Sequence, residues 1–194
     1  MRNRNLLERI IAFIRENHPE AYLVGGCVRD RLMGKESRDF DFVVPEGAIS
    51  LAREIADRFR GAFVLLDEKR EFARVVFRDF YIDLARRVGK DTLEDLSHRD
   101  FTINAMAVPL EDWGKEPLPI IDPYGGKRDL ELGLIRRLCP STFLEDPCRI
   151  LRAVRFSAQL RFTIDPETLK EMAEHAHRLI IVSRERLRDE ISLT

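Results

Sequence analysis

The sequence predicts an α+β (α/β) fold in which helices flank a mixed sheet, and three observations support this. Apolar residues recur with the helical period between Asn5 and Asn17. Short apolar runs typical of strands occupy residues 39–44, 62–67 and 72–77. Clusters of Gly, Pro and charged residues separate these segments. Helices and strands in such an order are typical of a sheet covered by helices.

Composition narrows the class of protein. The 194 residues leave room for one sizeable core, or for one domain and a fragment of another. A hydrophobic content of 44% with 35% charged residues excludes a disordered chain. The net charge of -1 gives no overall nucleic-acid footprint, so any RNA contact requires a local patch. Three cysteines without metal-ligand spacing indicate reduced thiols in a cytoplasmic protein.

The first elements lead to the most informative stretch of the chain. The charged N-terminal helix is neither a signal peptide nor a membrane span, and Pro19 ends it. A buried strand then begins at Tyr22 and breaks at Gly25-Gly26, where the backbone can turn sharply and approach a ligand. Arg29 follows in the first turns of a short helix, which gives an anion cradle beside the next strand.

Two aspartates lie on that next strand. Because side chains alternate along a strand, Asp39 and Asp41 point to one face while Phe40 and Phe42 point to the other. Two like charges on one face repel each other, and a divalent cation offsets this cost directly. Carboxylate oxygens are the ligands that Mg²⁺ prefers. The alternative is a solvent-facing edge strand with two exposed acids.

The remaining pattern predicts elements up to the C-terminal end. Helices are expected over residues 48–59, 145–156, 165–178 and 183–193, and strands over residues 62–67, 72–77 and 80–84. Pro147 suits the first turn of the 145–156 helix, where Asp146, Arg149, Arg152 and Arg155 recur every three residues as a polar ridge. The alternative for this ridge is a solvated amphipathic helix.

Several motifs resemble one known family. LVGGCVRD followed by DFDFVV resembles the signature of class II tRNA nucleotidyltransferases and of the related bacterial poly(A) polymerases, in the polymerase-beta superfamily. RDFTINA, DPYGGKRDL, EDPCR and SRERLRDE resemble further blocks of that family. The resemblance covers nearly the whole chain. It implies a nucleotidyltransferase head domain over residues 1–131 and a truncated, all-helical neck over residues 132–194.

The resemblance also implies roles for individual residues of the first half. Asp39 and Asp41 would hold Mg²⁺, and Asp83 is assigned as the third catalytic carboxylate by its place between the motifs. An acid alone on a strand is equally well explained as a surface residue at a strand end. Gly26 and Arg29 would cradle the triphosphate.

In the second half the resemblance implies nucleotide recognition. Arg99 would help to bind the incoming nucleotide, and Asp100 would lie near its sugar. Asp146 and Arg149 would read the base edge of CTP or ATP. Arg152 and Arg155 would lie nearer the phosphates and the interior of the fold. His98 stands where the family pattern has an arginine, which leaves open any contact made by the missing guanidinium.

The implied activity is Mg²⁺-dependent addition of C, as CC or CCA, to the 3′ end of tRNA from CTP or ATP, with release of pyrophosphate. Only Leu84 to Arg99 separate the Asp83 strand from RDFTINA, and this short separation resembles the CC-adding enzymes. The alternatives are a poly(A) polymerase or A-adding enzyme of the same family, a catalytically inactive nucleotide- or RNA-binding module, and a metal-dependent nuclease. The oligomeric state stays open.

Overall fold

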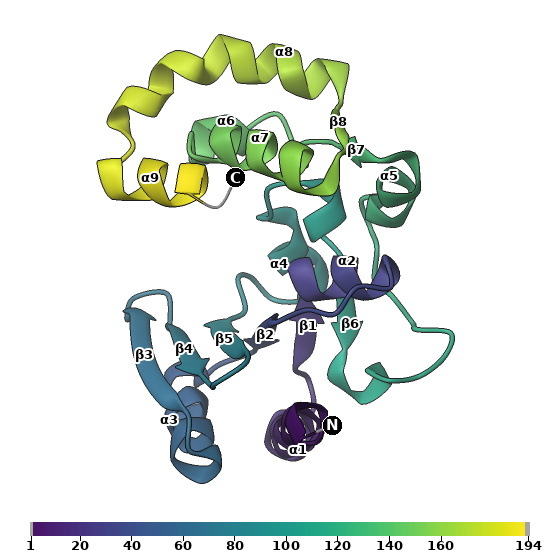
Figure 1. The fold of residues 1–194 in the computed structure, drawn as a ribbon, viewed down its shortest axis with the longest axis vertical. Coiled ribbons are helices and arrows are strands. Elements are labelled where there is room, and N and C mark those ends of the chain that lie inside the picture. The colour runs from purple at the N-terminus through teal and green to yellow at the C-terminus, as the bar shows by residue number, and fades with distance from the viewer. Residues whose placement is uncertain (1, 193–194) are drawn as a thin grey trace. The chain divides into compact units, whose positions relative to one another are not determined.

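The computed structural model describes residues 2–192, and the chain divides into two compact units (Figure 1). The first unit runs to His98 and resumes at Met106–Ile121. The second unit comprises Arg99–Ala105 and the chain from Asp122 onward. Each unit has its own hydrophobic core. The division between residues 131 and 132 expected from the family resemblance stays a prediction.

The first unit is built on a six-stranded sheet in the order β3-β4-β5-β2-β1-β6. Its strands are β1 (Tyr22–Val24), β2 (Asp39–Val44), β3 (Ala62–Asp67), β4 (Phe72–Val76), β5 (Tyr81–Arg86) and β6 (Ala107–Pro109). The β2–β5 pair is parallel, whereas the other neighbours are antiparallel. The mixed sheet confirms the predicted fold class.

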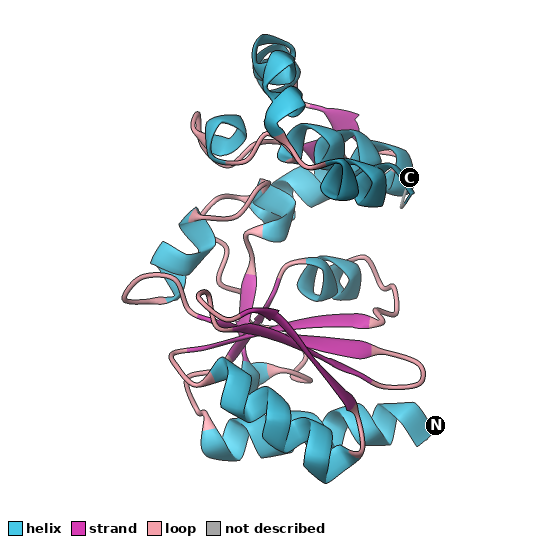
Figure 2. Cartoon of the chain, turned by 90° about the vertical axis from the view of Figure 1, so that its left-hand side faces the viewer, coloured by secondary structure: helices cyan, strands magenta, loops and turns pink. Residues whose placement is uncertain are grey.

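Helices cover both faces of this sheet. The first unit contains α1 (Arg2–Asn17), α2 (Gly26–Leu32), α3 (Ala48–Phe59), α4 (Thr92–Ser97) and the 3₁₀ turn η2 (Leu110–Asp112). Helices α1 and α3 lie together on one face of the sheet, and α2 lies on the other (Figure 2). Phe40 and Phe42 are buried in the core while Asp39 and Asp41 are half-buried, so the predicted alternation along β2 is confirmed.

The second unit is mostly helical. Its helices are α5 (Gly126–Leu132), α6 (Thr142–Glu145), α7 (Arg149–Leu160), α8 (Pro166–His175) and α9 (Arg184–Ser192), with 3₁₀ turns η1 (Thr102–Asn104) and η3 (Ala176–Ile181). A two-stranded parallel pair, β7 (Leu134–Ile135) with β8 (Thr163–Ile164), joins them. Phe101 packs edge to face on Phe156 in the core, with ring centroids 5.9 Å apart. Within residues 2–192 no helix combines the length and apolar character that crossing a membrane requires.

The helix expected over residues 145–156 is interrupted, and the prediction of its start was wrong. Glu145 ends α6, and α7 begins at Arg149. Asp146 between them is extended, with φ -147° and ψ 100°. A residue that precedes proline is sterically disfavoured in the helical region, so Asp146 before Pro147 separates the two helices. The Asp146 carboxylate therefore projects from a bend just before α7.

Candidate active site

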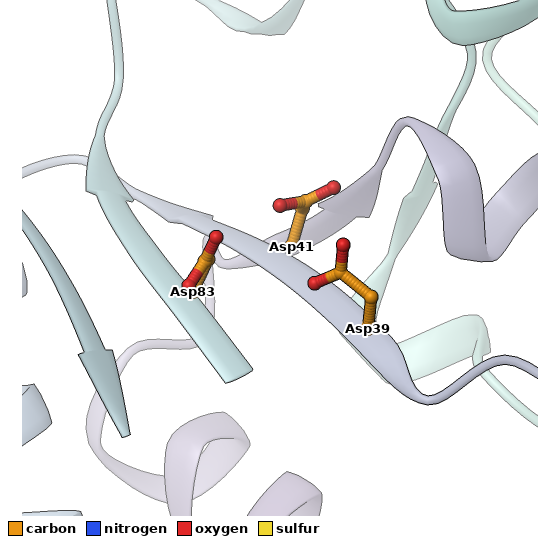
Figure 3. Close-up of side chains that lie close together, drawn as sticks. All are labelled: Asp39, Asp41 and Asp83. Atoms are coloured by element: carbon orange, nitrogen blue, oxygen red, sulfur yellow. The ribbon is translucent and has the colours of Figure 1, made fainter. Parts of the chain in front are cut away.

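Three carboxylates meet on one face of the sheet in the first unit. In the parallel β2–β5 pair, Asp41 lies opposite Asp83 and Asp39 lies opposite Tyr81. One oxygen from each of Asp39, Asp41 and Asp83 lies within 4.8 Å of the other two (Figure 3). Asp83 is buried at 5% exposure. The structure thus brings together the three acids that sequence reasoning assigned to one site.

Like charges this close require compensation, and part of it comes from a residue that sequence reasoning missed. Arg74 of β4 lies opposite Asp83 in the antiparallel β4–β5 pair. Its Nε donates to Oδ1 of Asp83 at 2.7 Å and its Nη2 donates to Oδ2 at 2.8 Å. The hydrogen bond to Asp83 raises the pKa of the Arg74 guanidinium, which stays protonated. The feature of the sequence that could have identified Arg74 is an arginine in the middle of an apolar strand.

Tyr81 is a second member of this cluster that sequence reasoning missed. The Arg74 guanidinium lies over the Tyr81 ring, 4.0 Å from its centroid. Burial and the negative charge of Asp39 raise the pKa of the Tyr81 phenol, so the hydroxyl keeps its proton. An aromatic ring and a guanidinium therefore flank the carboxylates on the same face of the sheet.

The donor set fits a hard divalent cation. All three clustered side chains offer carboxylate oxygens, and none offers nitrogen or sulfur. Oxygen ligands of this kind suit Mg²⁺, which keeps further positions for water and substrate phosphates. Asp39 and Asp41 are half-buried as residues, and Oδ1 of Asp39 is itself shielded from solvent. The three carboxylates therefore form a donor set that suits a divalent cation such as Mg²⁺.

Gly26 and Arg29, both in α2, lie side by side next to β2. Gly25 has φ 71°, a conformation that favours glycine, and it turns the chain from β1 into α2. A Cβ on Gly26 would lie 3.4 Å from Nη2 of Arg29, so the missing side chain lets the guanidinium lie close to the backbone. Arg29 is buried and donates to Oδ1 of Asp30 at 3.0 and 2.9 Å. The predicted role of this pair toward a triphosphate stays a prediction.

In the second unit, Asp100 joins two of the blocks that resemble the family. Its Oδ1 accepts from the backbone N–H of Phe101 at 2.8 Å and from Nδ2 of Asn104 at 3.0 Å. Its Oδ2 pairs with Nε of Arg152 in α7 at 2.9 Å. The buried Asp100 carboxylate therefore fixes the RDFTINA segment to the helix that carries Arg152. Arg99 beside it is half-buried, and its role stays a prediction.

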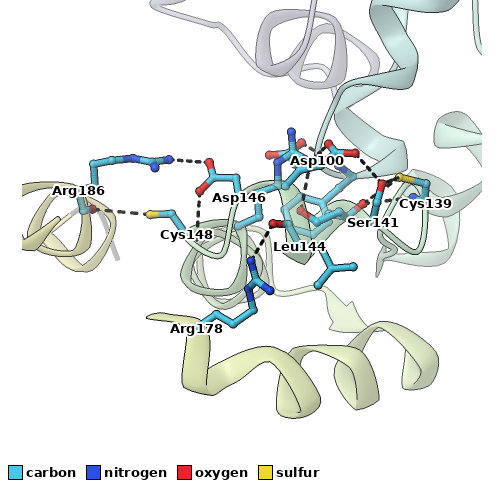
Figure 4. Close-up of polar contacts among 12 residues, drawn as sticks. Asp100, Cys139, Ser141, Leu144, Asp146, Cys148, Arg178 and Arg186 are labelled. Atoms are coloured by element: carbon cyan, nitrogen blue, oxygen red, sulfur yellow. Dashed lines mark hydrogen bonds and ion pairs between the residues drawn. The ribbon is translucent and has the colours of Figure 1, made fainter. Parts of the chain in front are cut away.

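Asp146 is held by a residue of the SRERLRDE block (Figure 4). Arg186 of α9 donates from Nη2 to Oδ2 of Asp146 at 2.6 Å, and the backbone N–H of Cys148 donates to Oδ1 at 3.1 Å. Burial alone would raise the pKa of the Asp146 carboxyl, but these hydrogen bonds lower it below its usual value. Asp146 is therefore ionised near neutral pH and able to accept hydrogen bonds. Sequence reasoning did not identify Arg186.

The arginines of α7 have different surroundings. Arg149 donates from Nη1 to the carbonyl oxygen of Thr142 and to Glu145, both at 3.3 Å. Its backbone N–H donates to the carbonyl oxygen of Asp146 at 3.1 Å, so the two residues assigned to base reading are adjacent. Arg155 pairs with Glu190 of α9 at 2.7 Å and is only 11% exposed. Its predicted contact with phosphate stays a prediction.

Comparison with known proteins identifies two matching segments. Residues 21–136 match the family described as the poly A polymerase head domain. Residues 161–193 match the family described as the probable RNA and SrmB-binding site of polymerase A.

Individual relatives have related names. A CC-adding tRNA nucleotidyltransferase of Synechocystis sp. is 44% identical over 176 residues, which cover 90% of this chain and 41% of the relative. An A-adding tRNA nucleotidyltransferase of Aquifex aeolicus is 43% identical, with 89% of this chain and 23% of the relative covered. A solved complex of a CCA-adding enzyme with ATP superposes with a TM-score of 0.81 at 37% identity, covering 98% of this chain and 47% of that one. The chain spans about two fifths of the length of the CC-adding relatives, 41% and 39% in two cases.

Proposed function

Because this chain belongs to the poly A polymerase head domain family, we propose that it carries the catalytic part of a template-independent tRNA nucleotidyltransferase. The proposed reaction transfers a cytidylate from CTP to the 3′ end of tRNA and releases pyrophosphate. The observation that carries the proposal is the cluster of Asp39, Asp41 and Asp83, whose oxygens lie within 4.8 Å of one another on one face of the sheet. The relatives named above support the choice of tRNA as the substrate.

The three carboxylates bind the metal in this proposal. Asp39 and Asp41 would be the Mg²⁺ ligands, and Asp83 would complete the site from the neighbouring strand. Mg²⁺ held by these carboxylates would supply positive charge that favours deprotonation of the RNA 3′-hydroxyl and departure of pyrophosphate. Arg29, packed against Gly26, would bind the triphosphate through charge-assisted hydrogen bonds.

Nucleotide selection is assigned to residues of the second unit. Asp146, ionised by its contacts, would accept from the exocyclic amino group of cytosine, and Arg149 would donate to the ring acceptors. Arg99 is assigned to the nucleotide, with Arg152 and Arg155 nearer its phosphates. We take residues 1–131 as the head and residues 132–194 as the neck.

The segment after β5 supports CC addition rather than addition of the whole CCA end. Asp91 caps α4 by accepting from the backbone N–H of Glu94 at 2.9 Å. Asp95 accepts from the backbone N–H of Val88 at 2.8 Å, and Glu94 accepts from that of Lys90 at 2.9 Å. This segment is thus a compact turn and helix closed by its own hydrogen bonds. Its shortness is the feature that resembles CC-adding enzymes, the name that two relatives at 44% identity carry, whereas a relative at 43% identity is named an A-adding enzyme.

Primer extension tests the proposal directly. The chain would be incubated with Mg²⁺ and a tRNA transcript that ends at the discriminator base, with CTP alone, ATP alone or both. We expect two cytidines to be added, pyrophosphate to be released and no adenosine to follow. Efficient incorporation of the terminal adenosine would contradict CC specificity. Absence of any Mg²⁺-dependent extension would contradict the transferase, and shortening of the RNA would support the nuclease.

We also propose that the protein works in the cytoplasm. Its three cysteines, Cys27, Cys139 and Cys148, are free thiols, which agrees with a reducing compartment.

A further inference from the structure

A row of side chains crosses three adjacent strands on the face that carries the carboxylates. Asp41 of β2 lies opposite Asp83 of β5, and Asp83 lies opposite Arg74 of β4. Residues that face each other across neighbouring strands project from the same face of the sheet. Asp83 is therefore flanked by an acid on one side and by an arginine on the other.

Arg74 and Asp83 form a two-point contact, a guanidinium fork. Two guanidinium nitrogens, Nε and Nη2, donate to separate oxygens of the carboxylate, at 2.7 and 2.8 Å. Two parallel hydrogen bonds fix the plane of a carboxylate as well as its position, which a single ammonium contact does not. Each carboxylate oxygen has two lone pairs, so Asp83 can accept from Arg74 and still offer an oxygen to a cation.

Arg74 is itself held in place. Its guanidinium lies over the ring of Tyr81, 4.0 Å from the centroid. Tyr81 is opposite Asp39 in the β2–β5 register, so the ring that supports Arg74 belongs to the same cluster of side chains. A planar guanidinium stacked on a ring loses less freedom when it forms a fork than a free side chain does.

We propose that Arg74 is a positioning residue that orients Asp83 as a metal ligand. The fork holds the Asp83 oxygen where it faces the oxygens of Asp39 and Asp41, within 4.8 Å of both, before any cation is bound. The inference rests on the proposed role of these carboxylates in holding Mg²⁺. The competing explanation is that Arg74 supplies positive charge only.

Binding of Mn²⁺, used as a spectroscopic probe for the Mg²⁺ site, separates the two explanations. Arg74→Lys keeps the charge but cannot form the fork. We expect it to weaken Mn²⁺ binding by about 10-fold, measured by electron paramagnetic resonance on the 194-residue chain. The matched control is Arg86→Lys, also in the β4–β5 region, whose exposed side chain is 4.0 Å from Glu71. The control should bind Mn²⁺ as the wild type does. Unchanged affinity in Arg74→Lys overturns the positioning role.

A double-mutant cycle shows whether Arg74 acts through Asp83. In an Asp83→Asn background, which retains the other two carboxylates, Arg74→Lys should cause no further loss of affinity. An equal loss in both backgrounds would mean that Arg74 acts elsewhere, and it would overturn the inference.

The failure of this inference differs from the failure of the proposed function. If Asp41→Asn leaves Mn²⁺ binding unchanged, the carboxylates are not the metal site, and both proposals fall. If Asp41→Asn abolishes binding while Arg74→Lys does not weaken it, only the role of Arg74 falls.

A second pair of variants applies if circular dichroism shows that Arg74→Lys is unfolded. Tyr81→Phe keeps the ring on which the guanidinium lies, whereas Tyr81→Leu removes it. Weaker Mn²⁺ binding in Tyr81→Leu than in Tyr81→Phe supports the inference, and equal affinity overturns it.

Discussion

Replacing Asp39 by Asn should make the metal-free protein more stable and the metal-bound protein less stable. The substitution keeps the shape of the side chain and removes one negative charge. The oxygens of Asp39 and Asp41 lie within 4.8 Å of each other. At that separation the repulsion is about 3.5 kcal/mol for an effective dielectric constant of about 20, and about 0.9 kcal/mol in bulk water. The half-buried site lies between these limits, so we expect Asp39→Asn to gain about 1–3 kcal/mol without metal.

Saturating Mg²⁺ should reverse this order. A ligand that binds only the folded state at a concentration about 1,000 times its Kd adds about 4.1 kcal/mol to the free energy of unfolding. The wild type should gain this amount, and Asp39→Asn, which lacks one ligand, should gain little. The variant should also lose nucleotidyl transfer while it keeps its fold.

Urea unfolding followed by circular dichroism, in EDTA and in excess Mg²⁺, measures both free energies. The control is Asp57→Asn on the exposed side of α3, which should change stability by less than about 0.5 kcal/mol under either condition. Lower stability of Asp39→Asn in EDTA would show that the carboxylate serves mainly as a hydrogen-bond acceptor. An equal gain from Mg²⁺ in wild type and variant would show that the ion binds elsewhere.

Two further predictions concern the second unit. Arg149→Ala should weaken CTP binding by about tenfold or more, because it removes charge-assisted hydrogen bonds. Isothermal titration calorimetry with CTP checks this against Arg128→Ala, an exposed control, and an unchanged CTP affinity refutes the base-reading role. Arg186→Met should lower the free energy of unfolding by up to about 1 kcal/mol at pH 7, because the pair with Asp146 is partly exposed. Since the folded-state pKa of Asp146 lies below its usual 3.8, the contribution of the pair is present above that pH and disappears as the pH falls through the lowered pKa. Urea unfolding from pH 7 to pH 2 measures this loss, and a difference that persists at the lowest pH contradicts it.

Several features were predictable because they depend on neighbours in the chain. The orientation of Asp39 and Asp41 follows from alternation along a single strand, and the structure has it. Helix α3 spans Ala48–Phe59, as its apolar periodicity predicts. The prediction of where the 145–156 helix starts was wrong for an equally local reason. The restriction that Pro147 places on the backbone of Asp146 can be read from the sequence.

The contacts of the site depended instead on the tertiary structure. Arg74 meets Asp83 because β4 and β5 pair in one register, and a shift of one residue would send Arg74 to the other face. The hydrogen bond from the Phe77 N–H to the Phe80 carbonyl marks the tight turn that sets this register, so recognising the turn would have located the pair.

The sequence by itself determined the family, the fold class and which acids share a face of β2, because motifs and strand alternation are local properties. Only the tertiary structure decided which arginines of distant elements pair with Asp100 and Asp146. Asp146 and Arg186 are 40 residues apart in the chain, and the Asp100–Arg152 contact at 2.9 Å likewise joins distant segments. Such pairs form where the packing of separate elements brings them within hydrogen-bond distance, and no spacing in the sequence encodes that.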